Sequence, residues 1–126
     1  RDVQLAGSYG QYAVNDPWYS SYWQSFTATT TGSLYSIQAN YYSQASFNLN
    51  ATVSATLNIF SGSGTGGTLL ATQAVTINQP LGVVTPNIFT LTSPINLTAG
   101  SQYTFQLIGS SNYFRIMKIL YIFLHM

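Results

Sequence analysis

The sequence predicts a single all-β domain over residues 1–126, a jelly-roll-like β-sandwich of about eight strands. Turn residues recur at spacings of about 8 to 12 residues, which is typical of sandwiches and barrels. The runs between the turns are rich in β-branched and aromatic residues, and none shows a sustained helical period of apolar residues. A chain of 126 residues is long enough to bury one hydrophobic core.

The N-terminal half supplies the first expected strands. Residues 1–22 form a polar, aromatic segment, and residues 23–28 and 34–39 then alternate in polarity, so we expect a strand in each of these two ranges. Residues 40–50 are rich in Tyr and Asn and fit either a strand edge or a loop. Residues 51–60 give the clearest strand, because apolar side chains alternate strictly with Thr, Ser and Asn.

The second half begins with a glycine-rich turn. Residues 61–68 contain four glycines and predict a flexible hairpin connection. Ser93-Pro94 is a further turn signal that divides two short apolar runs. The remaining strands are expected at residues 69–77, 88–91, 95–97 and 102–108.

Residues 114–126, FRIMKILYIFLHM, break the polar texture of the chain before them. Three interpretations stay open: a last strand buried on both faces, a strand that pairs with or is covered by a neighbouring subunit, and an artefact of an AT-rich message. We expect no membrane span, because about 13 residues with two cations fall short of the roughly 20 that a span needs. The candidate inter-subunit residues are Phe114, Ile116, Ile119, Tyr121 and Phe123.

Charged side chains are almost absent from the chain. The five charged residues are Arg1, Asp2, Asp16, Arg115 and Lys118. General acid–base chemistry needs titratable groups, so we expect no enzyme and no catalytic residues. One His, two Asp and no Cys cannot build a zinc site, and we expect no metal and no cofactor. Three cations cannot make the basic face that nucleic acid requires, so nucleic acid is not an expected partner.

The polar composition favours a place outside the cell. Ser, Thr, Asn and Gln make up 48 of the 126 residues, and a net charge of +1 gives little colloidal repulsion. A secreted, glycosylated or assembled protein fits this surface, and Asn50 and Asn96 are candidate N-glycosylation sites. Because the chain begins with Arg1 rather than Met, we expect it to be processed or part of a longer protein.

Aromatic side chains are the one surplus that could form a site. Exposed rings that pack on the apolar faces of sugars would form a platform, with Asn and Gln supplying hydrogen bonds. The alternative is packing at a strand edge or a subunit interface, where Tyr and Trp are enriched. The candidate glycan or interface aromatics are Trp18, Tyr19, Tyr22, Trp23, Tyr41 and Tyr42.

Five motifs follow one another between Gln24 and Ser110. They are QSFTA from Gln24, GSLYSI from Gly32, TLNIFSGSG with GGTLLA from Thr56, FTL with PI from Phe89, and LTAGSQYTF from Leu97. In this order they resemble secreted bacterial β-sandwich domains of cell-surface adhesins and related extracellular proteins. The resemblance implies a jelly-roll-like fold and a role in structure, adhesion or sugar binding, without catalytic residues. It also implies a last strand rich in Ser, Thr and Tyr, from which residues 114–126 depart.

We therefore expect a structural subunit of an extracellular filament or surface appendage, whose partner is a second copy of itself. A terminal segment, residues 1–14 or 114–126, would pair with the sheet of the next subunit by edge-strand complementation. A contact of this kind that does not close on itself gives a filament. The alternative is a carbohydrate-binding or adhesive module of a larger secreted surface protein, with glycans as partners. A viral capsid or spike jelly roll is a third class, which nothing in the chain specifically favours.

Overall fold

The protein is an all-β sandwich. The computed structural model describes residues 2–5, 10–11, 21–42, 52–78, 80, 83–109 and 118–125, and these residues form strands, turns and bends without a helix. The nine strands are β1 (Asp2–Leu5), β2 (Gly10–Gln11), β3 (Ser21–Thr27), β4 (Gly32–Tyr42), β5 (Thr52–Ser61), β6 (Leu69–Asn78), β7 (Val84–Leu97), β8 (Gln102–Gly109) and β9 (Lys118–His125).

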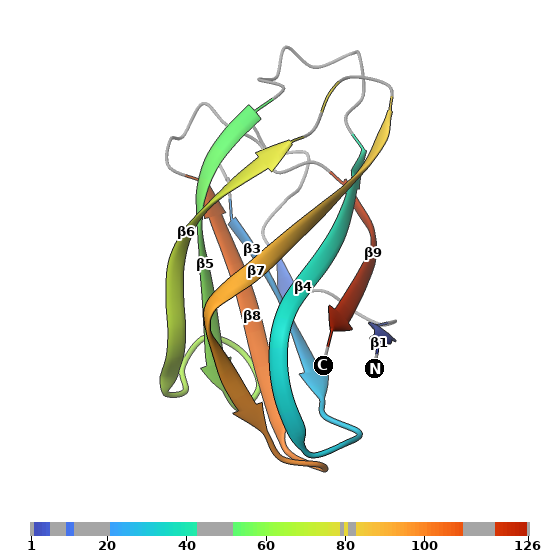
Figure 1. Cartoon of the computed structure of the whole chain (residues 1–126). Helices are drawn as coiled ribbons and strands as arrows, with labels where there is room; N and C mark the ends of the chain where they lie inside the picture. The colour runs from blue at the N-terminus through green and yellow to red at the C-terminus, as the bar shows by residue number, and fades with distance from the viewer. Residues whose placement is uncertain are drawn as a thin grey trace.

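Two antiparallel sheets face each other (Figure 1). The four-stranded sheet has the order β1-β9-β4-β7, and the five-stranded sheet has the order β2-β3-β8-β5-β6. Apart from β2, the pairs β1–β9, β3–β8, β4–β7 and β5–β6 are those of one long antiparallel hairpin wrapped over itself. That wrapping is the jelly-roll arrangement, so the predicted fold class is confirmed.

Most of the expected strands are present at their expected places. The strands predicted at 51–60, 69–77 and 102–108 are β5, β6 and β8, with ends that differ by one residue. The strand predicted at 34–39 is longer than expected, because β4 continues to Tyr42. The rest of the undecided segment, residues 43–50, lies outside the described residues.

Two short strands were predicted where the structure has one long strand. β7 runs through Ser93-Pro94, and the turn signal there marks an irregularity in pairing. Leu34 pairs with Ile95 while Ser36 pairs with Thr90, so β7 carries extra residues between these two points. Pro94 is tolerated because β7 lies at the edge of its sheet, where a missing N–H costs no ladder hydrogen bond.

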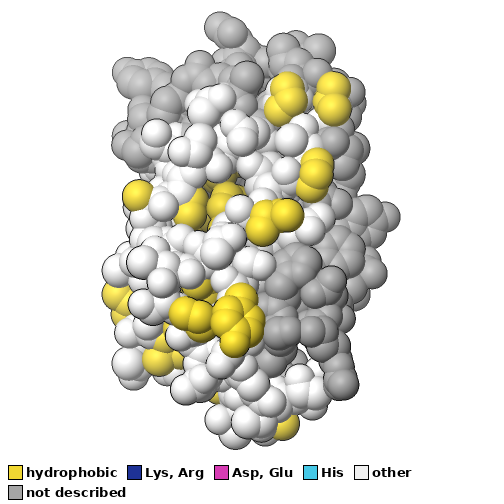
Figure 2. Space-filling view, in the orientation of Figure 1, with side chains coloured by type: hydrophobic (Ala, Val, Ile, Leu, Met, Phe, Trp, Pro, Cys, Tyr) yellow, Lys and Arg dark blue, Asp and Glu magenta, His cyan; other side chains and the backbone are white. Residues whose placement is uncertain are grey.

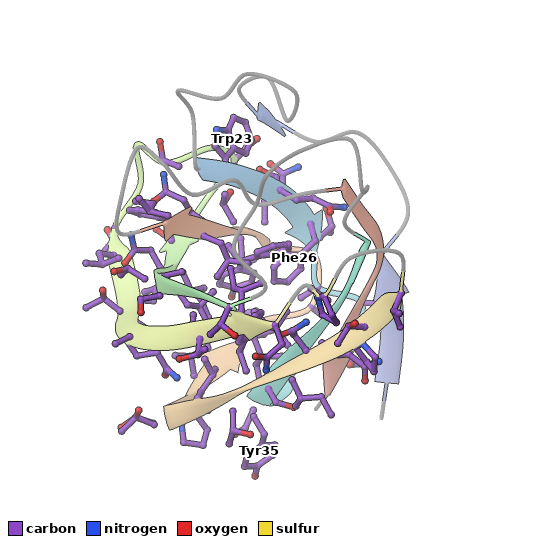
Figure 3. The ribbon with its side chains drawn as sticks, turned by 90° about the horizontal axis from the view of Figure 1, so that it is seen from above. Trp23, Phe26 and Tyr35 are labelled. Atoms are coloured by element: carbon purple, nitrogen blue, oxygen red, sulfur yellow. The ribbon has the colours of Figure 1, made fainter. Side chains whose placement is uncertain are left out.

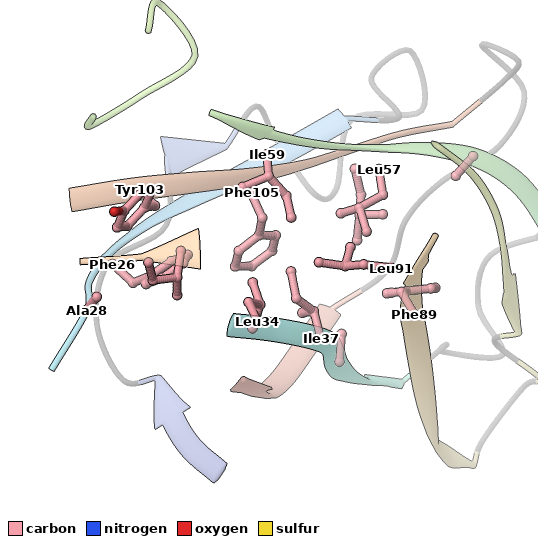
Figure 4. Packing of buried hydrophobic residues seen from close by; sticks show 14 of the residues in the cluster. Phe26, Ala28, Leu34, Ile37, Leu57, Ile59, Phe89, Leu91, Tyr103 and Phe105 are labelled. Carbon is pink, nitrogen blue, oxygen red and sulfur yellow. The ribbon is translucent and has the colours of Figure 1, made fainter. Parts of the chain in front are cut away.

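The core fills the space between the sheets. Inward side chains of the five-stranded sheet, such as Phe105 and Ile59, meet Leu34 and Ile37 of β4 (Figure 4), and all four are at most 1% exposed. The Tyr103 hydroxyl is satisfied, because it accepts a hydrogen bond from the Thr98 N–H at 2.8 Å. This packing supplies the main stabilisation of the fold, since burial of apolar surface is its largest favourable term.

Two side-chain amides bridge β6 and β7, which are edge strands of the two different sheets. The Gln73 amide donates from Nε2 to the Thr90 carbonyl at 2.8 Å and accepts through Oε1 from the Thr92 N–H at 2.9 Å. The Asn87 amide accepts from the Asn78 N–H at 2.7 Å and donates to the Asn78 carbonyl at 2.8 Å. Each amide pairs with backbone as a neighbouring strand would, and so protects an otherwise open edge. We call these two the amide clamps.

Candidate functional site

The outer face of the five-stranded sheet carries a row of side chains drawn from four strands. Strict alternation turns Phe26 and Phe105 inward, so that Trp23 and Gln106 face outward. Trp23 of β3 lies at the outer side of the sheet, with Phe26 behind it in the core and Tyr35 on the opposite side of the molecule (Figure 3).

The register aligns this row across the sheet. Trp23 pairs with Gln106 of β8, Gln106 with Asn58 of β5, and Asn58 with Thr72 of β6. Trp23, Gln106 and Asn58 are partly exposed, and Thr72 is exposed. We call these four residues the Trp23 row.

Two amides at the centre of the Trp23 row form a pair. Asn58 Nδ2 donates to Gln106 Oε1 over 3.1 Å. The bond uses one donor of Asn58 and one acceptor of Gln106, so Asn58 Oδ1 keeps its acceptor capacity and Gln106 Nε2 keeps its donor capacity. The row therefore presents an acceptor and a donor side by side, next to an indole ring.

The glycine loop, residues 61–68, lies beside the Trp23 row. The Ser61 N–H donates to the Thr68 carbonyl at 2.9 Å, which closes the hairpin. The Gly62 N–H donates to the Gln102 carbonyl at 2.8 Å, which ties the loop to β8. These bonds, with those described next, replace the expected flexible connection by a loop attached to the sheet.

A chain of hydroxyl groups fastens the glycine loop to β3 and β8. The Gly64 N–H donates to Ser25 Oγ at 3.0 Å, Ser25 Oγ lies 2.8 Å from Thr104 Oγ1, and Thr104 Oγ1 donates to the Gly62 carbonyl at 2.7 Å. Each hydroxyl has one proton, and that of Thr104 is used on Gly62, so Ser25 must donate to Thr104. Ser63, 3.3 Å from Ser25, then donates to Ser25.

Gly64 and Gly67 are required by the shape of the loop. Gly64 has a φ of +79°, a left-handed conformation that favours glycine. A Cβ at Gly67 would overlap the Ser61 carbonyl oxygen. A Cβ at Gly64 would meet the Trp23 ring at Cη2, 3.9 Å away, so the loop stands directly beside the indole.

The strands and the loop that form the site contain no charged residue. No Asp, Glu, Lys, Arg or His occurs between Asp16 and Arg115. Figure 2 shows the opposite side of the molecule, which carries β4, β6 and β7, and there too the described atoms belong to hydrophobic and neutral polar side chains. In the described part of the chain, no group of three or more His, Cys, Asp or Glu could hold a metal ion. Stacking and neutral hydrogen bonding are the chemistry that the Trp23 row can supply.

The predicted aromatic cluster divides between the two sheets. Tyr22 and Trp23 lie in β3, whereas Tyr41 and Tyr42 end β4 in the opposite sheet. Of the six candidates, only Trp23 has a described side chain. Trp18 and Tyr19 lie outside the described residues altogether.

The glycosylation candidates are described in part. Asn96 lies on β7 with an exposed side chain, and its Oδ1 accepts a hydrogen bond from Ser33 Oγ at 3.2 Å. Asn50 lies outside the described residues.

The C-terminal strand lies inside the sheet of its own chain. β9 pairs with β1 on one side and with β4 on the other. Three of the candidate inter-subunit residues, Ile119, Tyr121 and Phe123, belong to β9, and Phe114 and Ile116 lie outside the described residues. Donation of β9 to a neighbour would require both of its ladders to open. Among the described residues, no helix is both long and apolar enough to cross a membrane.

Sequence reasoning missed three polar members of the site. Asn58, Gln106 and Thr104 all lie at alternating polar positions that were expected to face solvent, and that much was visible in the sequence. Their proximity depends on the register between β5 and β8, which joins residues almost fifty positions apart and leaves no local signal.

Comparison with known proteins gives no family assignment. No protein-family model and no curated protein matches the sequence. Among solved structures, a β-glucosidase from Paenibacillus barengoltzii matches with a TM-score of 0.44 and 22% identity, over 84% of this chain and 10% of the glucosidase. The VP2 subviral particle of infectious bursal disease virus matches with a TM-score of 0.42 and 14% identity, over 98% of this chain and 31% of VP2. The β-sandwich distantly resembles domains of these two proteins, and the chain spans less than a third of the length of either.

Proposed function

We propose that the chain is a non-catalytic, extracellular binding module that holds carbohydrate on the outer face of its five-stranded sheet. The observation that carries the proposal is the Trp23 row, in which a partly exposed indole lies beside a hydrogen-bonded Asn58–Gln106 amide pair. An indole face packs against the C–H face of a sugar ring, and a few convergent polar groups fix the orientation of the ligand.

The remaining features fit this role. The chain has almost no titratable groups for catalysis, and its surface of Ser, Thr, Asn and Gln suits a secreted protein. The motifs between Gln24 and Ser110 resemble secreted bacterial cell-surface domains, which supports a place on the outside of a cell.

A binding assay with matched variants tests the proposal. We expect the full chain to bind at least one glycan in a panel studied by calorimetry, and Trp23→Ala to reduce that affinity at least tenfold. Tyr35→Ala is the control, because Tyr35 is also an exposed aromatic residue (54%) but lies on the opposite outer face. Binding that survives Trp23→Ala and is lost in Tyr35→Ala would contradict the site, and no binding to any glycan would contradict the function.

Filament assembly is a second proposal, supported by a different face. Tyr35 and Ile88, 54% and 60% exposed, lie on the four-stranded sheet, and the neutral surface offers no charge repulsion between stacked copies. Of the two terminal segments, the N-terminal one is the better donor. β1 is an edge strand held along one side, whereas β9 is paired on both sides.

Engineered disulfides test the exchange of β1. Val3 pairs with Leu124, and the chain contains no cysteine, so Val3→Cys with Leu124→Cys places one thiol pair across the β1–β9 ladder. Exchange of β1 between subunits predicts a ladder of crosslinked chains in oxidised, non-reducing gels and filaments in electron micrographs. A single intrachain crosslink with dispersed particles would contradict it.

A further inference from the structure

We infer that the Trp23 row selects an extended, neutral glycan with equatorial neighbouring hydroxyls, as in a β-1,4-linked glucose or xylose chain, and rejects acidic glycans. This inference rests on the proposed function. It assigns a direction, a length and a charge preference to the ligand, and each of these follows from a separate feature of the site.

The direction follows from the glycine loop. The Ser25–Thr104 pair lies one row along the strands from Trp23 and Gln106, a shift of about 7 Å for two residues. The loop is fastened over that pair through Gly62 and Gly64, and it therefore forms a wall along one side of the Trp23 row. A chain ligand fits along the foot of this wall, across the strands, and not parallel to them.

The length follows from the number of strands that contribute. The Trp23 row crosses β3, β8, β5 and β6, so Trp23 and Thr72 are separated by three strand spacings, or about 14 Å. A single sugar ring covers only part of this distance. The row therefore suits several consecutive sugars, with one ring on the indole and the next ones over the amides.

The hydroxyl preference follows from the amide pair. Asn58 Oδ1 accepts and Gln106 Nε2 donates, and the two amides are joined by the bond between Asn58 Nδ2 and Gln106 Oε1. Two adjacent hydroxyls match this arrangement, because each hydroxyl both donates and accepts. Equatorial hydroxyls also leave both faces of a pyranose ring as C–H surfaces, which is what stacking on Trp23 requires.

The charge preference follows from the absence of cations. A bound carboxylate or sulfate must be compensated when water leaves it, and Arg or Lys commonly supplies that compensation. No Arg, Lys or His occurs between Asp16 and Arg115. All residues of the Trp23 row and of the glycine loop lie in this range. An acidic glycan would therefore lose hydration at this site without gaining a partner.

Calorimetry with defined oligosaccharides tests the inference. We expect cellohexaose or xylohexaose to bind at least tenfold more tightly than hexagalacturonate, and at least tenfold more tightly than the corresponding disaccharide. Affinity for the neutral hexasaccharides should change less than twofold across about 0.01 to 0.5 M NaCl, because no ion pair forms. Asn58→Ala should weaken binding about three- to tenfold through a lost hydrogen bond.

Two further variants separate the possible failures. Thr76→Ala, an exposed position on β6 outside the row, is the matched control and should leave affinity unchanged. Gln106→Arg should raise the affinity for hexagalacturonate by supplying the missing cation. Equal or tighter binding of hexagalacturonate by the unmodified chain, or equal binding of the disaccharide, would overturn the inference while carbohydrate binding stands. If no glycan binds, the proposed function itself fails.

Discussion

Gln24 carries the only buried side-chain polar atom without a hydrogen-bond partner in the described part of the chain. The side chain is 3% exposed, and its Oε1 has no donor. A buried carbonyl without a partner costs about 1–3 kcal/mol, since it gives up its bonds to water and receives nothing in return. Gln24 is also a polar side chain on the inward face of β3, and the next inward residues along the chain, Phe26 and Ala28, are apolar.

Replacement of Gln24 by methionine should therefore stabilise the fold. Gln24→Met keeps the length of the side chain and removes the amide, and we expect the free energy of unfolding to rise by about 1 kcal/mol. Urea denaturation monitored by circular dichroism measures the change. A loss of stability of similar size would show that the Gln24 amide is hydrogen-bonded in solution.

Gly67 and Gly66 provide a matched pair of tests within the glycine loop. A Cβ at Gly67 would overlap the Ser61 carbonyl, whereas a Cβ at Gly66 would meet nothing within 4 Å. We expect Gly67→Ala to lower the free energy of unfolding by about 1–3 kcal/mol, and Gly66→Ala to change it by less than about 0.5 kcal/mol. Thermal melts of the two variants measure the difference. Equal stability of the two variants would show that the loop has no fixed conformation at Gly67.

At the scale of elements, the amide clamps protect the open edges of strands β6 and β7. Gln73→Ala removes two hydrogen bonds and should cost about 1–2 kcal/mol of stability. It also bares the Thr90 carbonyl and the Thr92 N–H on edge strand β7, so we expect association that increases with concentration. Sedimentation velocity measures that association, with Thr76→Ala as the control on the same strand. A monomeric Gln73→Ala protein at all concentrations would contradict the protective role.

The strands show what a sequence can predict and where it stops. β5 and β8 were predictable because apolar side chains on the inner face alternate with polar ones on the outer face. Thr104 on the outer face of β8 is nevertheless buried, since the glycine loop covers it. The sequence did not predict that β7 is a single strand, because Ser93-Pro94 is a turn signal. A strand can run through a proline at the edge of a sheet, and only the sheet order shows that β7 lies at an edge. β2 was missed because two residues are too short for any pattern.

Of the four residues in the Trp23 row, the sequence predicted only Trp23 as a candidate site residue. Trp23 follows from the surplus of rings, and the alternation places it on the face opposite Gln24 and Phe26. Only the structure shows that this face is the outer one. Its neighbours Gln106 and Asn58 come from strands that are distant in sequence. No local rule connects them, because register is decided by the packing of the whole inner face.

At the scale of the whole molecule, stability should be nearly independent of salt. All charged residues lie at or before Asp16, or at or after Arg115, so strands β3 to β8 carry no charge to screen, and Asp2 of β1 and Lys118 of β9 belong to the margin of one sheet. We expect the free energy of unfolding to change by less than about 0.5 kcal/mol between about 0.02 and 0.5 M NaCl. Urea titrations at the two salt concentrations measure it, and a change above about 1 kcal/mol would mean that the terminal charges take part in the fold.

Titration of the isotopically labelled protein with cellohexaose, followed by NMR, tests the central claim most directly. The account predicts shifts at the Trp23 indole N–H and at the Asn58 and Gln106 side-chain amides, with Tyr35 and Ile88 on the opposite sheet unmoved. Shifts confined to Tyr35 and Ile88, or an unchanged spectrum at millimolar cellohexaose and xylohexaose, would contradict it.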